Sequence, residues 1–270
     1  FHWGVMGAAL ATIISQLVSA LLTLASLVGA EMQPYHLKLH RVAMDAATLR
    51  DIVRIGLPAG LQSVMYNISN IIIQTSINAF GTTTVAAWTA YGKLDSLFWM
   101  SMNSMGLSVT TFAGQNFGAK QYDRVRKGAW VCLFFCAVLA LGLGAVIYAF
   151  GAPLVGLFSD DAQVVERALE IIHLLTPSFI TYAAIEALSG TIRGSGDAWV
   201  PMALTAGGVC GLRILWVLGA AQLFGSLTGV LVSYPISWGV TSVLYIAYFL
   251  AGGWLRRCIA VQDARRAGGA

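Results

Sequence analysis

Charged residues are scarce in this chain: they make up 10% of its 270 residues, whereas a soluble domain typically carries about 25%. Hydrophobic residues account for 57% of the sequence, and the mean hydropathy is +0.74. This balance excludes an ordinary soluble enzyme and a disordered chain. The formal net charge is +4, but so few charges, embedded in apolar sequence, also exclude a nucleic-acid-binding protein.

Cysteine and histidine are scarce too. Four cysteines provide no disulfide framework, and Cys132 and Cys136 fall inside an apolar run, where buried thiols act as small hydrophobic side chains. No second His or Cys stands at ligand spacing from His173, so the sequence predicts no metal site and a packing role for this residue. No signal segment precedes Trp3. We expect the chain to be a piece of a longer polytopic membrane protein.

Long runs without Asp, Glu, Lys or Arg are what the sequence has in abundance. A hydrocarbon core of about 30 Å requires roughly 20 apolar residues in a helix, and several runs reach that length. The sequence therefore predicts an all-α fold, a polytopic transmembrane bundle of about seven helices. Their expected ranges are residues 1–30, 55–79, 84–114, 128–150, 162–192, 199–218 and 227–251.

The basic residues are distributed unevenly between the connectors. Thirteen of the 16 lie on alternate connectors, which places them on one side of the membrane. By the positive-inside rule that side is cytoplasmic, so the C-terminus is expected to be cytoplasmic in a multi-pass protein of the plasma membrane. These residues are Lys38, Arg41, Arg50, Arg54, Lys120, Arg124, Arg126, Lys127, Arg193, Arg256, Arg257, Arg265 and Arg266.

The connector over residues 31–54 is the longest. In its second half, apolar and charged residues separate onto two sides, which predicts a short amphipathic helix on the membrane surface before Pro58. Such a segment suits a cytoplasmic linker between two bundles, so helix 1–30 is assigned to a missing N-terminal lobe. Residues 55–252 then form a six-helix C-terminal lobe, and residues 253–270 form a basic cytoplasmic tail.

Polar residues follow one stripe of helix 55–79. Steps of four residues drift by only about 40° around a helix, so the side chains form one slowly turning row. A row of amides facing lipid would be costly. Two interpretations remain open: hydrogen bonds between helices and the lining of a wet cavity. The row consists of Gln62, Tyr66, Asn67, Asn70, Gln74 and Asn78.

Few charges lie deep in the predicted membrane segments. Glu186 precedes Arg193 by seven residues, about 10 Å inside the cytoplasmic end; it either exchanges a proton or a sodium ion or pairs structurally with a neighbouring helix. Lys93 and Asp95 point to different helix faces, and Glu186 is one candidate partner for Lys93. Arg213 is expected to snorkel or pair at the edge of the apolar core rather than contact substrate.

Three segments carry a family resemblance. They are Ile55–Gln62, Gly114–Arg124 and Gly190–Pro201, and their order and spacing resemble the second half of multidrug and toxic compound extrusion (MATE) transporters. The resemblance covers essentially the whole chain, with residues 1–30 as the family's sixth helix and the remainder as its seventh to twelfth. It implies that the Gly-Gln-Asn turn and an Arg193–Asp197 pair shape cytoplasmic loops.

The resemblance also implies an activity. Such a protein is a secondary antiporter, not an enzyme, in which two six-helix bundles face a central cavity. Inward movement of Na⁺ or H⁺ drives export of cationic or amphipathic small molecules, with no cofactor. Its partners are the substrate, the lipid bilayer and the missing N-terminal lobe. The cation-coupling candidates are Glu186, Asp95 and Lys93, and the cavity-lining candidates are Gln62, Tyr66, Asn67, Asn70, Gln74 and Tyr182.

The sequence departs from the family pattern at the coupling site. Many members place an acid earlier on the helix of Glu186, where this chain has Tyr182. Members with a Glu on the family's seventh helix would place it near Tyr66 or Asn67, and neither is acidic. Coupling through the absent N-terminal lobe therefore stays open.

Two other functions share parts of the pattern. Gly194-Ser-Gly-Asp197 matches the GxGD string of intramembrane aspartyl proteases, but such proteases need two aspartates at bilayer depth, and the only Tyr-Asp pair, at Asp123, lies in a basic connector. A lipid-linked oligosaccharide flippase of the same superfamily would need an abundantly cationic cavity. Only Lys93 and Arg213 are available for that role, against Glu186 and Asp95.

Overall fold

The computed structural model describes residues 3–29, 36–37, 45–220 and 225–268. Within these ranges the chain is helical and contains no strand. It divides into two units, Phe1–Asp51 and Ile52–Ala270. The predicted all-α class is confirmed, and the two units are described separately below.

The first unit contains α1 (Gly4–Gly29). Large apolar side chains are exposed around this helix, as expected for a segment whose solvent is lipid rather than water. Half of the predicted linker, including Lys38 and Arg41, lies outside the described residues. The exposed apolar residues are Leu10, Ile13, Ile14, Leu17, Val18, Leu21, Leu22 and Leu24.

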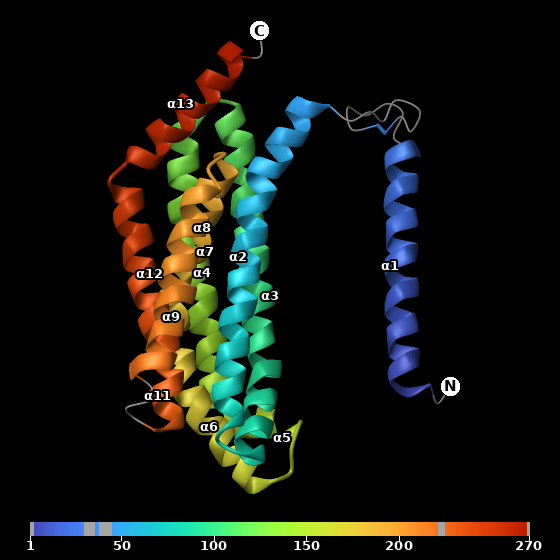
Figure 1. The fold of residues 1–270 in the computed structure, drawn as a ribbon, viewed down its shortest axis with the longest axis vertical. Helices are drawn as coiled ribbons and strands as arrows, with labels where there is room; N and C mark the ends of the chain where they lie inside the picture. The colour runs from blue at the N-terminus through green and yellow to red at the C-terminus, as the bar shows by residue number, and fades with distance from the viewer. Residues whose placement is uncertain (1–2, 30–35, 38–44, 221–224, 269–270) are drawn as a thin grey trace. The chain divides into compact units, whose positions relative to one another are not determined.

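The helix α2 (Ala46–Asn78) joins two segments that the sequence separates. A short surface helix and a new helix from residue 55 were expected, but one helix runs through Pro58. Proline removes a hydrogen bond inside a helix and bends it, and Figure 1 shows the first turns of α2 inclined away from the rest. The expected boundary at residues 54–55 therefore lies within a continuous helix.

Three helices follow in close succession. Gly81, with a φ of 91°, provides the turn before α3 (Thr82–Gly118), and α4 (Tyr122–Ala149) and a short α5 (Gly151–Gly156) come next. α3 ends four residues later than expected and α4 begins six residues earlier. The Gly-Gln-Asn segment is therefore mostly helical, and the connector shrinks to residues 119–121.

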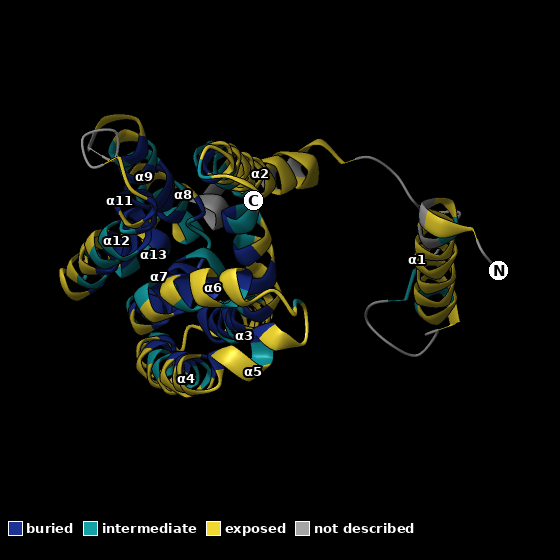
Figure 2. Ribbon diagram, turned by 90° about the horizontal axis from the view of Figure 1, so that it is seen from below, coloured by how far each residue is buried: buried dark blue, intermediate teal, exposed yellow. Residues whose placement is uncertain are grey.

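The predicted helix over residues 162–192 is two helices. α6 (Ala162–Leu175) begins at Asp161, whose carboxylate accepts the Gln163 N–H at 2.9 Å. A 3₁₀ turn at Thr176–Ser178, containing Pro177, leads into α7 (Phe179–Gly194). Most residues of α7 are buried, and Figure 2 shows it between α3, α4 and α12. α7 is thus the helix around which the second unit packs.

The remaining helices alternate between regular and widened turns. α8 (Trp199–Thr205) and α9 (Leu212–Leu215) are followed by two π-helical segments, η3 (Ala206–Gly211) and η4 (Trp216–Ala220) respectively. α11 (Leu227–Leu231), α12 (Ser233–Leu250) and α13 (Gly253–Gly268) complete the chain. π-helical turns inside helices are rare and occur frequently at functional sites.

Membrane-spanning character differs among these helices. Within the described residues, five helical stretches are long and apolar enough to cross a membrane: 9–29, 122–149, 162–194, 199–219 and 227–250. α2 and α3 are also long, at 33 and 37 residues, but they are more polar. With these two, the architecture has about seven spans, as predicted.

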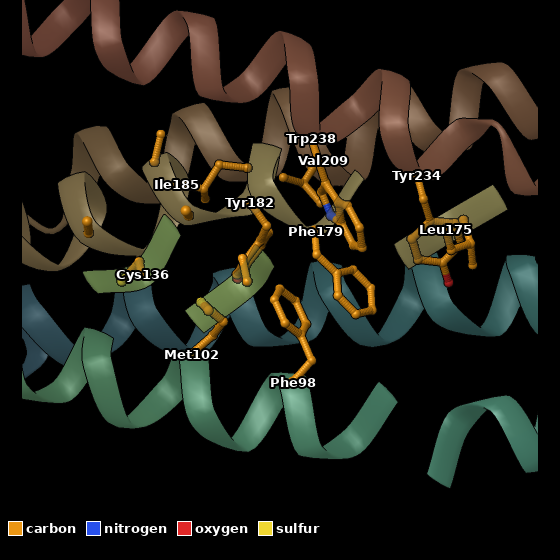
Figure 3. Packing of buried hydrophobic residues seen from close by; sticks show 14 of the residues in the cluster. Phe98, Met102, Cys136, Leu175, Phe179, Tyr182, Ile185, Val209, Tyr234 and Trp238 are labelled. Carbon is orange, nitrogen blue, oxygen red and sulfur yellow. The ribbon is translucent and has the colours of Figure 1, made fainter. Parts of the chain in front are cut away.

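Aromatic side chains form the centre of the second unit. The rings of Phe98 and Phe179 stack with centroids 4.0 Å apart, and Tyr182 meets Trp238 edge-on at 5.6 Å. Figure 3 shows these four side chains gathered between their helices. Offset and edge-on ring pairs add to the free energy gained by burial, so this cluster fixes α3, α7 and α12 relative to one another.

Candidate functional site

One large cavity lies inside the second unit. It has a volume of about 670 Å³, within the usual range for small-molecule sites. Its walls come from α2, α3, α7, α9 and α12. The lining residues include Gln62, Ser63, Tyr66, Asn67, Asn70, Gln74, Trp88, Asp95, Trp99, Asn103, Tyr182, Glu186, Ser189, Arg193, Arg213 and Tyr234.

All six cavity-lining candidates border this cavity. The hydrogen bonds of the α2 amides stay within α2: Asn67 donates to the Ser63 carbonyl at 2.9 Å, and Gln74 donates to Asn78 at 2.9 Å. The amides of this row thus border the cavity and make no hydrogen bond to another helix among the described residues, whereas the Tyr66 hydroxyl interacts with the Tyr182 hydroxyl of α7. For the amides, the structure favours the lining of a cavity.

Glu186 occupies the α7 wall of the cavity. The Tyr182 hydroxyl, one turn earlier, donates a hydrogen bond to Glu186 Oε2 at 3.2 Å. The carboxyl group rests over Gly106 of α3, where a Cβ atom would collide with it. Arg193, two turns later, borders the same cavity and attracts the carboxylate through space. Glu186 is therefore held in a fitted niche open to the cavity.

Asp95 is the second carboxylate in the cavity. Tyr91 donates its hydroxyl to Oδ1 at 3.1 Å, and Trp99 donates Nε1 to Oδ2 at 2.8 Å. Both donors stand one turn away on α3, the spacing at which helix side chains meet. Each carboxylate oxygen is thus held by a neighbour on the same helix.

Lys93 does not join the other coupling candidates. Its side chain is exposed and does not border the cavity, and it forms no ion pair with Glu186 among the described residues. Two residues correspond to about 200° around a helix, so Lys93 points away when Asp95 points inward. The expected Lys93–Glu186 pair is wrong.

Arg213 lies in the cavity, whereas the sequence predicted a position at the edge of the apolar core. It is only 2% exposed, its Nε and Nη2 lie 3.4 and 3.2 Å from Ser237 Oγ, and its Cζ sits 3.9 Å above the Tyr234 ring centroid. It neither snorkels outward nor pairs with a carboxylate in the described residues. The one sequence signal for this position was an Arg inside an apolar helix. The π-helical turns on either side of it have no recognisable sequence pattern.

The expected Arg193–Asp197 pair is also absent. Asp197 Oδ1 accepts the N–H groups of Trp199 and Val200 at 3.1 and 3.3 Å, and Oδ2 lies 3.5 Å from Arg257 Nε. Asp197 therefore begins α8 and contacts α13, while Arg193 borders the cavity. Because its carboxylate is held by the first N–H groups of α8, Asp197 does not serve as the catalytic aspartate that the aspartyl-protease alternative requires.

The remaining candidates outside the cavity have packing roles. His173 lies against the Tyr148 ring, with centroids 4.4 Å apart. Cys132 and Cys136 are buried, one turn apart, with their sulfur atoms 3.9 Å from each other. In the part of the chain that the structure describes, no three His, Cys, Asp or Glu residues group as metal ligands do.

Aromatic rings form one side of the cavity, which we call the aromatic wall: Trp88, Trp99, Tyr182 and Tyr234. The rings of Trp99 and Tyr182 meet edge-on with centroids 4.8 Å apart, and the ring centroids of Trp88 and Tyr234 are 6.1 Å apart. Chemically, the cavity offers amides on α2, aromatic rings on α3, α7 and α12, two carboxylates and two guanidinium groups. Such a lining suits an amphipathic small molecule and an exchangeable cation.

Known proteins resemble this chain along most of its length. It is 26% identical over 254 residues to the probable multidrug resistance protein YoeA of Bacillus subtilis, covering 91% of the chain and 54% of that protein. It is 24% identical to the probable multidrug resistance protein NorM of Thermotoga maritima, covering 96% and 56%. An FAD transporter of Shewanella oneidensis is 28% identical, covering 86% and 51%. The chain spans about half the length of these curated relatives.

Solved structures share the fold. A multidrug resistance MATE family transporter in an outward-facing conformation superposes with a TM-score of 0.81 at 20% identity, covering 97% of this chain and 58% of that one. A MOP superfamily transporter from Pyrococcus furiosus gives 0.81 at 21% identity, with the same coverage. The MatE family model matches residues 58–218, which is more than half of the sequence. This chain is thus a multi-pass membrane protein that belongs to the MatE family.

Proposed function

We propose that this chain is the C-terminal part of a secondary antiporter of the plasma membrane, with its C-terminus in the cytoplasm. The full protein exports cationic or amphipathic small molecules in exchange for Na⁺ or H⁺. The relatives named for multidrug resistance support this activity, and their greater length supports a missing N-terminal lobe that completes the cavity. The basic connectors support the orientation.

The observation that carries this proposal is the position of Glu186. A carboxylate inside a membrane bundle is costly unless a proton, a cation or a polar partner compensates it. Among the described residues, Glu186 accepts a side-chain hydrogen bond from Tyr182 alone, and it opens onto a cavity of ligand size. A proton or sodium ion bound there changes the charge that a cationic substrate meets, and this competition is the physical basis of exchange.

The relatives also widen the substrate range. The Shewanella oneidensis relative is named as a transporter of FAD, a planar aromatic compound with phosphate groups. Amphipathic substrates in the proposed class therefore include compounds with acidic groups as well as organic cations. The lipid-linked oligosaccharide flippase is less well supported, because the two cavity arginines are balanced by Glu186 and Asp95.

Efflux of ethidium from cells that express the full-length parent gene tests the proposal. We expect an imposed sodium or pH gradient to drive efflux, and the effective gradient identifies the coupling ion. Glu186→Gln keeps the size but removes the charge, so gradient-driven efflux should be lost at unchanged protein level.

Glu170→Gln is the matched control for this substitution. Glu170 lies on α6, is exposed, and pairs only with the exposed Arg167 at 2.6 Å, so efflux should remain at the level of the unchanged protein. Wild-type efflux from the Glu186→Gln protein would remove Glu186 from coupling. No efflux under either gradient, with the protein in the membrane, would contradict the antiporter proposal itself.

A further inference from the structure

Arg213 presents an unusual combination of burial and incomplete pairing. Its side chain is 2% exposed, yet it borders the cavity. Two of its donor nitrogens, Nε and Nη2, approach a single acceptor, the Ser237 hydroxyl. A guanidinium group has five N–H donors in a planar fork, and among the described residues only the N–H groups on two of its nitrogens meet an acceptor.

The charge of Arg213 is not cancelled by a contacting carboxylate. No ion pair joins it to an acid within the described residues. Asp95 attracts it through space, but both oxygens of Asp95 accept hydrogen bonds from Tyr91 and Trp99 instead. An ionisable residue inside a membrane protein is costly and typically marks a substrate or ion pathway.

The surroundings hold the guanidinium in one orientation. Its Cζ lies 3.9 Å over the Tyr234 ring centroid and 5.8 Å from that of Trp238. Both rings belong to α12, and Figure 3 shows these two side chains on the same stretch of that helix. Stacking on an aromatic face leaves the edge of the guanidinium fork for in-plane hydrogen bonds, which is how Arg binds carboxylate and phosphate groups.

We propose that Arg213 forms an anion subsite within the cavity and binds the phosphate or carboxylate group of an aromatic, amphipathic substrate. The aromatic wall beside it takes the planar part of the same molecule. This inference rests on the proposed function only in assigning the cavity to substrate; binding itself needs no ion gradient. It narrows the substrate class from amphipathic compounds in general to those with an acidic group.

Equilibrium binding of two flavins tests this subsite. FMN and riboflavin share one ring system and differ by a phosphate group, and quenching of flavin fluorescence reports their binding to the purified full-length parent protein. A charge-assisted hydrogen-bonded contact is worth roughly tenfold or more in affinity, so FMN should bind at least about tenfold more tightly than riboflavin. Inorganic phosphate should compete with FMN and leave riboflavin binding unchanged.

Substitutions of Arg213 separate an anion subsite from a structural role. Arg213→Gln should weaken FMN binding to the level of riboflavin and leave riboflavin binding unchanged. Arg213→Lys keeps the charge without the fork, so it should retain part of the preference for FMN, and it serves as the test if the Gln variant fails to fold. Equal binding of both flavins by the unchanged protein, or equal weakening of both by Arg213→Gln, would overturn the proposal.

Failure of this inference is distinguishable from failure of the proposed function. Ethidium carries no acidic group, so gradient-driven ethidium efflux by the unchanged protein does not require an anion subsite. A protein that exports ethidium but shows no phosphate preference would overturn the subsite alone. A protein that binds FMN through Arg213 but exports nothing under either gradient would overturn the antiporter proposal alone.

Discussion

The absence of a side chain at Gly106 leaves the space that the Glu186 carboxyl group occupies. The two residues lie on adjacent helices, α3 and α7, and the carboxyl group occupies the volume that any side chain at Gly106 would fill. Because Tyr182 is the single side chain that donates a hydrogen bond to Glu186 in the part of the chain that the structure describes, the position of Glu186 depends on this absence of a side chain as much as on polar contacts.

We therefore expect Gly106→Ala to impair ion coupling. The obstacle is the far end of the flexible Glu186 side chain, which can move aside at little cost in folding free energy. The added carbon pushes the carboxyl group away from Tyr182, and a lost hydrogen bond to a charged group is worth about tenfold or more in an equilibrium constant, so gradient-driven efflux should fall by about that factor. Efflux of ethidium from cells expressing the full-length variant measures the effect.

Gly92→Ala is the corresponding control, because Gly92 lies on the same helix with open space around it. Its efflux should match that of the unchanged protein. Equal efflux from the Gly106→Ala and Gly92→Ala proteins would mean that the fit between Gly106 and Glu186 has no functional role.

Individual cavity residues are predictable from the sequence where they follow a helical period. The α2 row repeats every four residues, and this spacing alone assigns Gln62, Asn70 and Gln74 to one surface. Arg193 and Arg213 carry no such period, and their positions depend on long-range packing. From the family resemblance, Arg193 was expected to pair with Asp197 in a cytoplasmic loop, but the N–H groups of α8 and Arg257 take that carboxylate instead.

At the scale of elements, α3 and α7 approach each other along a line of small residues. A Cβ on Gly194 would collide with the Thr110 carbonyl of α3, and one on Gly190 would crowd Val109. The Thr110 hydroxyl lies 3.1 Å from the Gly190 carbonyl and donates to it across the interface. Close backbone approach through small residues is a common way to join helices within a membrane.

Gly194→Ala should therefore destabilise the bundle. The obstacle is backbone rather than a flexible side chain, so the two helices must separate, at a cost of about 1–3 kcal/mol. The midpoint of thermal unfolding of the purified full-length protein in detergent should fall. Gly142→Ala on α4 is the matched control, since no atom lies near its added carbon; its midpoint should stay the same or rise slightly, because Ala favours helix more than Gly does. Equal midpoints for the two variants would contradict tight α3–α7 packing.

The elements themselves were largely predictable, because a charge-free run of membrane length leaves few alternatives to a helix. The interruptions between and within these helices were less predictable. Pro177 divides α6 from α7 with a 3₁₀ turn, whereas Pro58 leaves α2 continuous. Proline alone does not determine which result occurs, since neighbouring helices decide whether the freed backbone groups are compensated.

At the scale of the whole second unit, α13 folds back onto the bundle. Trp254 stacks on Phe249 with centroids 4.9 Å apart, and its Nε1 donates to the Phe249 carbonyl at 3.2 Å. Cys258, one turn later, is buried near the ends of α3 and α7. The basic tail expected from the sequence is thus, over residues 253–263, a docked helix with one buried face.

Burial of Cys258 gives this docking a chemical signature. Removal from water raises the pKa of its thiol to about 12. Because the thiolate is the reactive form, maleimide should label Cys258 at least about a hundredfold more slowly than an exposed cysteine of pKa about 8.5. Its labelling rate should also keep rising with pH above 9, where an exposed thiol is already ionised.

The measurement uses the full-length parent with every other cysteine removed. Ala260→Cys in a Cys258→Ser background is the matched control, because Ala260 is exposed on the same helix. Trp254→Ala should accelerate labelling of Cys258 by releasing α13. Equal rates for Cys258 and the cysteine at position 260 would mean that α13 does not stay docked in solution.

The polarity of α2 and α3 has a consequence for how the protein is made. Among the candidate spans, 122–149 is the most apolar, and we expect it to enter lipid through its own hydrophobicity. α2 and α3 are more polar, because each carries residues that line the cavity. We therefore expect the insertion of α2 and α3 to depend on contacts with later helices. The residues that would serve transport thus make membrane insertion of this bundle cooperative.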